Sequence, residues 1–136
     1  MDGDTDQLRR RVDQLREQGV DVRTLADQLV ARTESLGWTG RAAESMRLRI
    51  HERATRLRDA AAEHEVAAET LRRHLLQVSG VRESIARRQS RAASLVADAR
   101  SRATQEQALE DDRVLIAFTP PPSGHRDWLT IELPGL

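Results

Sequence analysis

Histidine is the residue type in this chain best suited to metal binding or proton transfer. His51 and His64 are each followed by Glu, which is how the His-Glu-x-x-His motif of zinc peptidases begins. In that motif two imidazoles one helical turn apart hold the metal, but the fifth residue here is Thr55 or Ala68, so the second ligand is missing. His64 also falls in an apolar heptad stripe, which favours a histidine in a helix interface.

The remaining chemistry is equally sparse. The chain has no cysteine, no Gly-rich phosphate loop and no Gly-x-Ser-x-Gly nucleophile elbow. Its carboxylates fall at the spacing of solvated helix faces and do not converge. We therefore expect a protein that is not an enzyme, with no catalytic residues, no cofactor and no metal.

Composition points to helices that pair through narrow interfaces. Of 136 residues, 2% are aromatic and 32% are charged, which does not suit a broad globular core. The formal net charge is zero, so a general affinity for nucleic acid or anionic membranes has no support. All basic residues are Arg and none is Lys, which indicates the GC-rich coding bias of, for example, an actinobacterial genome.

The N-terminal residues are acidic and lack the basic and apolar regions of a signal peptide. No apolar run approaches the length of a membrane span. We expect a protein of the bacterial cytoplasm, or one exported by a route that accepts folded chains.

Apolar residues recur at spacings of three, four and seven along two long segments. They predict helices over about 5–36 and 41–78 that pair as an antiparallel hairpin. The predicted register places Leu29 opposite Ile50 and Leu15 opposite His64. The predicted interface stripe consists of Leu15, Val22, Leu29, Ile50, Leu57 and Leu71.

Between the two segments, a bulky residue lies between two glycines. Gly37 suits the position after a helix end, and Thr39 is a plausible N-cap. Antiparallel helices splay where they meet, so we expect the Trp38 indole to fill the apolar wedge there. On this basis Trp38→Ala should cost about 3 kcal/mol or more of stability. Gly40 would let the second helix approach the first.

Trp38-Thr39-Gly40, set between two helical patterns and followed by Arg41-Ala42-Ala43, resembles the W-x-G turn of the WXG100, or ESAT-6-like, family. The resemblance covers about residues 4–78. It implies a helical hairpin that forms four-helix dimers, either with itself or with another W-x-G or secreted protein, in type VII secretion. Many exported members carry a Tyr, three residues and an acid after the second helix, and this chain has no Tyr. Its own export is therefore open.

A third apolar pattern follows Ser79-Gly80 and predicts a helix over about 82–107. Gly80 would end the second helix, and the third would fold back along the hairpin as a small bundle. The alternative is one continuous rod, because Ile85 keeps the heptad phase of Leu71 and Val78.

The C-terminal segment, residues 109–136, differs from the helical domain predicted over 4–108. Two β-prone runs, 114–118 and 128–133, flank three consecutive prolines. We expect a loose hairpin that covers the bundle or adds to a partner's sheet.

These patterns favour a protein–protein interaction module related to type VII secretion. A structural coiled coil that dimerises or spaces other domains is the alternative, and a basic helical nucleic-acid binder is a third interpretation. The last rests on arginines crowding the first half of the second helix, among them Arg49 and Arg53, which form either a basic face for an acidic partner or a solvated face with local ion pairs.

Overall fold

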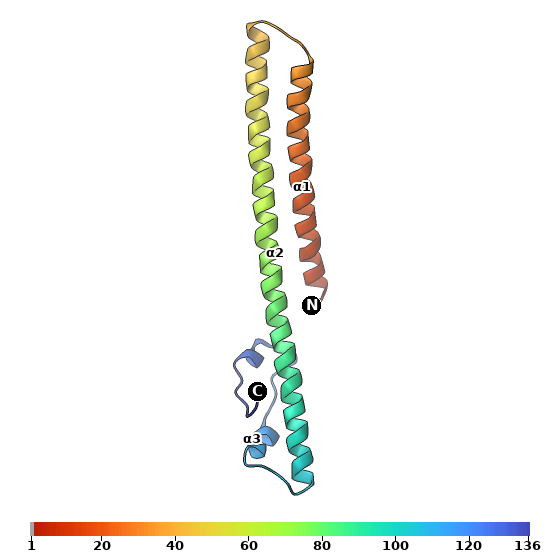
Figure 1. Ribbon diagram of the computed structural model, residues 1–136, viewed down its shortest axis with the longest axis vertical. Coiled ribbons are helices and arrows are strands. Elements are labelled where there is room, and N and C mark those ends of the chain that lie inside the picture. The colour runs from red at the N-terminus through yellow and green to blue at the C-terminus, as the bar shows by residue number, and fades with distance from the viewer. Residues whose placement is uncertain (1) are drawn as a thin grey trace. The chain divides into compact units, whose positions relative to one another are not determined.

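The computed structural model describes residues 2–136, most of which are helical (Figure 1). Helix α1 spans Asp2–Ser35 and helix α2 spans Arg41–Thr104. Two short elements follow, helix α3 at Asp112–Ala117 and the 3-10 helix η1 at Arg126–Leu129. No strand occurs among the described residues, and the prediction of an all-α protein is confirmed.

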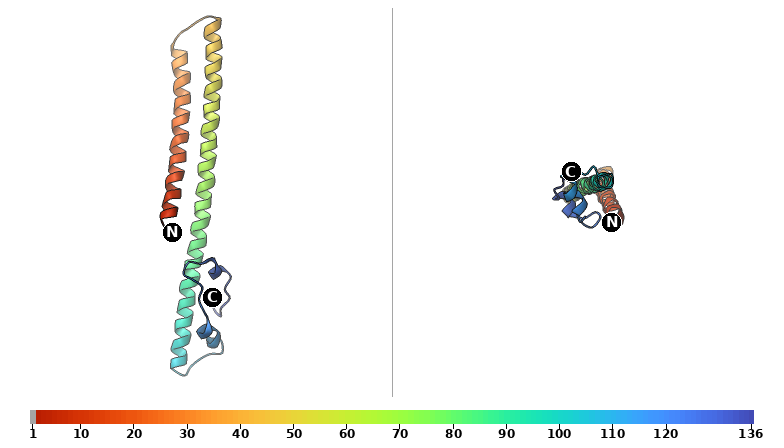
Figure 2. Two further views of the ribbon diagram at one scale, coloured as in Figure 1. Left: turned by 180° about the vertical axis from the view of Figure 1, so that it is seen from behind. Right: turned by 90° about the horizontal axis from the view of Figure 1, so that it is seen from below.

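The chain divides into two compact units, one ending at Leu76 and the other spanning Gln77–Leu136. In the first unit, α1 and the N-terminal part of α2 run antiparallel side by side, as two opposite views show (Figure 1 and Figure 2). Residues 36–40 connect them, and Gly37 and Gly40 there have φ angles of 63° and 104°, which favour glycine. The predicted helical hairpin is therefore present.

The two helices of the hairpin meet along columns of mainly small residues at heptad spacing. Small side chains let helix axes approach closely, and the seven-residue repeat keeps the same stripe facing the partner over many turns. The heptad repeat of each column therefore favours a helix and also determines which face of that helix packs against its neighbour. The buried columns are Val12, Gly19, Ala26 and Thr33 in α1, and Ala54, Ala61, Ala68 and Leu75 in α2.

The contacts of Gly19 show which residues of the two helices lie opposite each other. A Cβ atom built on Gly19 would lie 3.3 Å from the carbonyl oxygen of Ala61. The same Cβ would also lie 3.5 Å from the Cβ of His64 and 3.7 Å from the Cγ of Glu65. The prediction paired Leu15 with His64, which places Gly19 opposite Ala60, whereas Gly19 faces residues 61–65. The observed pairing is therefore displaced from the predicted one by up to about one helical turn.

The predicted turn at Gly80 and the separate helix over 82–107 are wrong, because α2 continues through this region. A glycine inside a helix costs only about 1 kcal/mol, and no atom would crowd a side chain at this one. The apolar phase runs unbroken from Val78 to Ile85, and the residues after Val81 offer no good N-cap for a new helix. Extending the helix therefore costs less than ending it.

The expected β-prone tail is also wrong. The first run forms α3, and part of the second forms η1. A strand needs a neighbour for its backbone groups, and here arginine side chains of α2 supply that need. The Nε of Arg88 donates to the carbonyl oxygen of Trp128 at 2.6 Å, and the Nε of Arg91 donates to that of Gly135 at 2.8 Å.

The second unit has a core of its own, in which the tail covers α2. Ile85 and Ala92 of α2 are buried against Trp128. The Trp128 indole is 3% exposed, and its Nε1 donates to the carbonyl oxygen of Pro122 at 3.1 Å. Phe118 meets the indole edge to face, with ring centroids 6.0 Å apart. The stripe expected to cover the hairpin is thus covered by the chain's own C-terminal segment.

Candidate interaction surface

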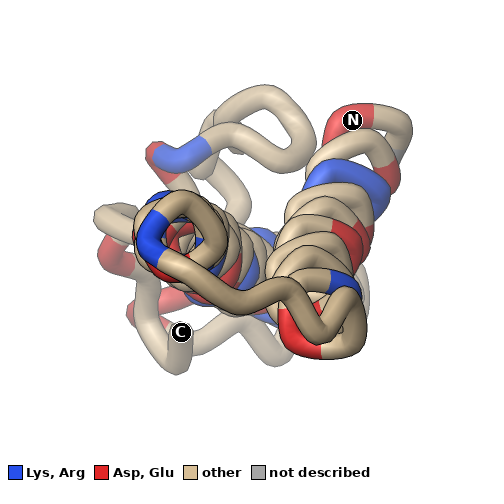
Figure 3. The backbone as a smooth tube through the Cα atoms, turned by 90° about the horizontal axis from the view of Figure 1, so that it is seen from above, with Lys and Arg blue, Asp and Glu red and all other residues tan. Residues whose placement is uncertain are grey.

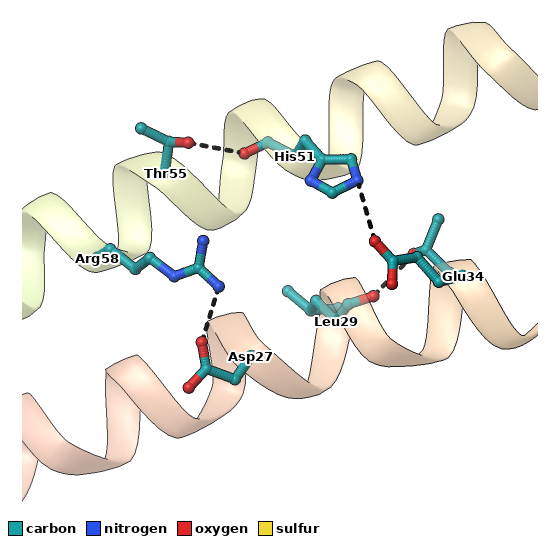
Figure 4. A network of polar contacts seen from close by, with 7 residues as sticks. Asp27, Leu29, Glu34, His51, Thr55 and Arg58 are labelled. Atoms are coloured by element: carbon teal, nitrogen blue, oxygen red, sulfur yellow. Dashed lines mark hydrogen bonds and ion pairs between the residues drawn. The ribbon is translucent and has the colours of Figure 1, made fainter.

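Polar contacts between side chains of α1 and α2 gather on one side of the hairpin. The residue four positions after a buried one lies about 40° to one side of it on a helix, and Arg23 and Glu65 hold this position relative to Gly19 and Ala61. We call this the closed side. Exposed pairs of this kind contribute about 0–1 kcal/mol each. The contacts, two of which Figure 4 draws, are Arg23 Nη2 to Glu65 Oε1 at 2.9 Å, Arg58 Nη2 to Asp27 Oδ1 at 2.7 Å, and His51 Nε2 to Glu34 Oε1 at 3.9 Å.

Larger aliphatic side chains lie on the opposite side. The residue three positions after a buried one lies about 60° to the other side, and this is where the six residues of the predicted interface stripe fall. All six are half-buried, and the neighbouring Leu25 and Met46 are 49% and 45% exposed. We call this surface the open face. It consists of Leu8, Leu15, Val22, Leu25 and Leu29 in α1, and Met46, Ile50, Leu57, His64 and Leu71 in α2.

The division between small buried residues and large half-buried ones matters for what the hairpin can bind. The fully buried column consists of Gly and Ala at most positions, which contributes little apolar transfer energy. The leucines that would contribute more keep part of their surface in water. One hairpin therefore leaves its best apolar surface incompletely covered, and an additional helix along the open face would complete the burial.

Trp38 does not fill a wedge between the helices as expected. It lies in the connection, its side chain is 49% exposed, and its carbonyl oxygen accepts a hydrogen bond from Arg47 Nη2. The connection of residues 36–40 is long enough for the helix ends to pair without an indole between them. Trp38 instead borders a surface hollow of about 330 Å³, lined by Trp38, Thr39, Ala42, Ala43 and Met46.

A second hollow continues from Met46 along the first turns of α2. Its volume is about 560 Å³, and Arg49 and Arg53 stand among its lining residues. Met46 belongs to both hollows, and its flexible side chain can adapt to the shape of a partner. The complete lining is Ala42, Ser45, Met46, Arg49, Ile50 and Arg53.

A buried ion pair fixes the start of the tail in the second unit. Asp112 is 1% exposed, and its two carboxylate oxygens accept from Arg102 Nε and Nη2 at 2.9 and 2.8 Å. The backbone N–H of Leu109 donates to the same carboxylate at 2.8 Å. These donors, with Arg102 the main cause, lower the pKa of Asp112 from 3.8 to about 2.

The second unit also contains a mostly apolar cavity of about 460 Å³ between α2 and the tail. Phe118, Pro120, Pro121 and Trp128 form its tail side. Gln89 at its edge is already engaged, because its Oε1 accepts from the backbone N–H of Gly124 at 3.0 Å. The cavity holds no convergent set of polar groups that selects one ligand.

The histidines are dispersed among the described residues. His51 contacts Glu34 on the closed side, and the Nδ1 of His64 lies 2.8 Å from the carbonyl oxygen of Ala60 in its own helix. His125 caps η1 by accepting from the backbone N–H of Asp127. The described residues contain no group of three or more His, Cys, Asp or Glu side chains placed to hold a metal ion. None of the described helices is long and apolar enough to cross a membrane.

No protein-family model, curated protein or solved structure shows a significant match to this chain. The resemblance to the WXG100 family therefore rests on the W-x-G tripeptide and its placement alone.

Sequence reasoning missed the small members of the buried column and the arginines that hold the tail. The heptad spacing of Gly19 from Val12 and Ala26 could have indicated a place where the two helices approach closely. Arg88 and Arg91 lie within the segment that was predicted to form a third helix. Their hydrogen bonds to carbonyl groups of the tail form between segments distant in sequence, so no local sequence pattern predicts them.

Proposed function

We propose that this chain is a non-enzymatic protein–protein interaction module that binds a helical partner along the open face of its hairpin. The observation that carries the proposal is the position of the large aliphatic residues, which are half-buried on one side of the hairpin while the ion pairs occupy the other. Full burial of an exposed Leu or Ile side chain contributes about 1.5–3 kcal/mol, so covering the exposed half of one of these side chains contributes about half of that. A partner that covered several of them would gain enough free energy for a specific complex.

We further propose a role in type VII secretion, as an exported protein or as a chaperone-like companion of one. The support is the resemblance of Trp38-Thr39-Gly40 between two long helices to the W-x-G turn. In this role the partner is another W-x-G protein or a secreted protein, and the chain resides in the bacterial cytoplasm or is exported with that partner.

The interaction is tested with proteins encoded by genes next to this one, mixed with the full chain and measured by sedimentation equilibrium. Leu57→Glu on the open face should abolish the complex, because it places a charge in the half-buried apolar stripe that the partner would cover. Val66→Glu is the matched control, since Val66 is 66% exposed and lies outside the open face. Complexes that tolerate Leu57→Glu would refute the proposed surface.

The secretion role needs a separate measurement in the organism that encodes the chain. Deletion of its type VII secretion ATPase should leave either this chain or its bound partner inside the cell. Unchanged export of both would remove the secretion role and leave the interaction module. In that case the structural coiled coil is the better description, because α2 carries heptads over much of its 64 residues.

A further inference from the structure

The arginines in the first half of α2 fall into two groups that the sequence did not separate. Arg47 donates to the Trp38 carbonyl oxygen, and Arg58 reaches across to Asp27 of α1, as Figure 4 shows. Both are therefore used within the hairpin. Arg49 and Arg53 line the hollow beside Met46, and among the described residues neither guanidinium group has a carboxylate within ion-pair distance.

Arginine is also unopposed on the α1 side of this region. Arg32 lies three positions after Leu29, toward the open face, and forms no ion pair within the described chain. Acidic residues of the neighbouring turns, such as Asp27 and Glu34, point instead to the closed side, where they contact α2. Charges of both signs occur along the helices as a whole (Figure 3), so this separation is local to the hairpin end.

We call the end of the open face beside the connection the tip. No carboxylate lies among its positions, although acidic residues are as frequent as arginine in the chain as a whole. An apolar surface rimmed only by unpaired arginines is incomplete in two ways, since both its aliphatic groups and its charges lack a complement. The tip consists of Val22, Leu25, Leu29, Arg32, Leu36, Ala42, Met46, Arg49, Ile50, Arg53 and Leu57.

From this arrangement we infer that the tip binds an amphipathic helix whose apolar stripe is flanked by Asp or Glu. The inference rests on the proposed function and names the chemistry of its partner. The apolar stripe of the incoming helix covers Ile50, Leu57 and Met46. Its flanking carboxylates pair with the guanidinium groups on either side, which sets the partner's register and speeds its association.

A second copy of this chain fits the tip less well. Two tips placed together bring arginines against arginines, which disfavours association. An antiparallel arrangement brings the tip against the far end of the open face, whose rim holds Arg11, Gln18 and His74 together with Asp4 and Glu63. Because basic side chains stand among these two carboxylates, the far end complements the arginines of the tip only in part, and a separate helix with acidic flanks fits better.

Designed helical peptides test this inference with the full-length protein. The first peptide carries Leu at both core positions of four heptads and Glu at the flanking positions, and the second replaces every Glu by Lys. Fluorescence anisotropy of the labelled peptides should show at least about tenfold tighter binding of the Glu peptide at low salt. This preference should shrink at about 0.5 M salt, because the rim charges are exposed and screened.

Matched variants assign the preference to the tip. Arg49→Gln with Arg53→Gln should weaken binding of the Glu peptide about tenfold and leave helix content by circular dichroism unchanged. Arg10→Gln with Arg16→Gln removes the same charge from other surfaces of α1 and should change affinity much less. Equal loss in both double variants would show a general charge effect and overturn the inference.

The remaining outcomes separate this inference from the proposed function. Equal binding of both peptides, abolished by Leu57→Glu, overturns the acidic partner and keeps the interaction module. Self-association through the open face, without peptide binding, makes a second copy the occupant. Retention on heparin that survives Leu57→Glu would assign the arginines to a polyanion. Absence of peptide binding and of self-association contradicts both proposals.

Discussion

The two tryptophans of this chain differ in how much of each indole is buried. Trp38 is half-exposed in the connection, whereas Trp128 is 3% exposed and anchors the tail to Ile85 and Ala92. A buried indole contributes apolar burial and, through its N–H, a satisfied hydrogen bond. Residue type alone therefore does not predict the importance of these two residues.

Truncation of the two tryptophans should have unequal effects on stability. Trp128→Ala should cost about 3–5 kcal/mol of the second unit's stability, because it removes a large buried side chain. Trp38→Ala should cost about 1 kcal/mol, since half of its surface is already in water. Urea unfolding followed by circular dichroism measures both. Equal costs would show that Trp38 is better buried than its exposed fraction of 49% indicates.

The stability of the second unit should depend on pH through Asp112, whose carboxylate fixes the start of the tail. The pKa of Asp112 falls from 3.8 to about 2 on folding, so the carboxylate stabilises the fold fully above its unfolded pKa. This stabilisation is lost as the pH falls through the folded pKa. Asp112→Asn should weaken the packing of the tail on α2 at neutral pH. It should also remove the loss of stability that otherwise occurs between about pH 4 and 2.

The tail can be followed by Trp128 emission in a Trp38→Phe background, in which Trp128 is the only tryptophan. Glu69→Gln is the control, because the pKa of Glu69 is also lowered to about 2, chiefly by its hydrogen bond from Arg72 in the first unit. This control should leave the Trp128 titration unchanged. An identical acid midpoint with and without Asp112 would refute the anchoring role.

At the scale of elements, the continuity of α2 is the feature that most changes the architecture. A helix passes through a glycine when its apolar phase continues and no cap competes. Gly80 satisfies both conditions. Gly19 is also helical, but its position is crowded by the neighbouring helix. Glycine at position 80 therefore only lowers helix stability, whereas glycine at position 19 allows the two helices to pack closely.

Alanine substitution should distinguish the two glycines. Gly80→Ala should stabilise the chain by about 1 kcal/mol through helix propensity, because a Cβ there meets no atom within 4 Å. Gly19→Ala should gain clearly less or lose stability, since its Cβ lies 3.3 Å from the Ala61 carbonyl oxygen and the helices must separate slightly. Thermal unfolding measures the difference. A larger gain at Gly19 would contradict the close approach.

At the scale of the whole molecule, the chain contains two cores with different construction. The first is a seam of small and aliphatic residues between two helices, in which Val12, Ala68 and Leu75 form a cluster, and the second is a set of aromatic and aliphatic tail residues on one helix. Hydrogen bonds from arginine side chains to backbone carbonyls are prominent in the second unit. We expect each core to respond to substitutions within its own unit.

Hydrogen exchange with peptide resolution tests this expectation. Ala61→Leu overpacks the first seam, costs about 1–3 kcal/mol, and should speed exchange in α1 while the tail stays protected. Trp128→Ala should have the opposite pattern, with faster exchange over 112–136 and unchanged exchange in α1. Loss of protection throughout the chain in either variant would show that the two units unfold as one.

The sequence by itself determined that the chain is helical and that its first part forms a hairpin, because heptad spacing acts locally and each turn of helix repeats the same information. The exact register of the hairpin and the continuity of α2 through Gly80 were not determined in this way. The predicted interface stripe is half-buried, and the column that is fully buried between the helices is a different one, which the close approach at Gly19 and Ala61 decides. Tertiary structure alone decided the fate of the tail. Its β-prone runs have no strand partner, and Arg88 and Arg91 satisfy their backbone carbonyls from a helix distant in sequence. Tertiary structure also decided which arginines form contacts within the hairpin and which remain available to a partner.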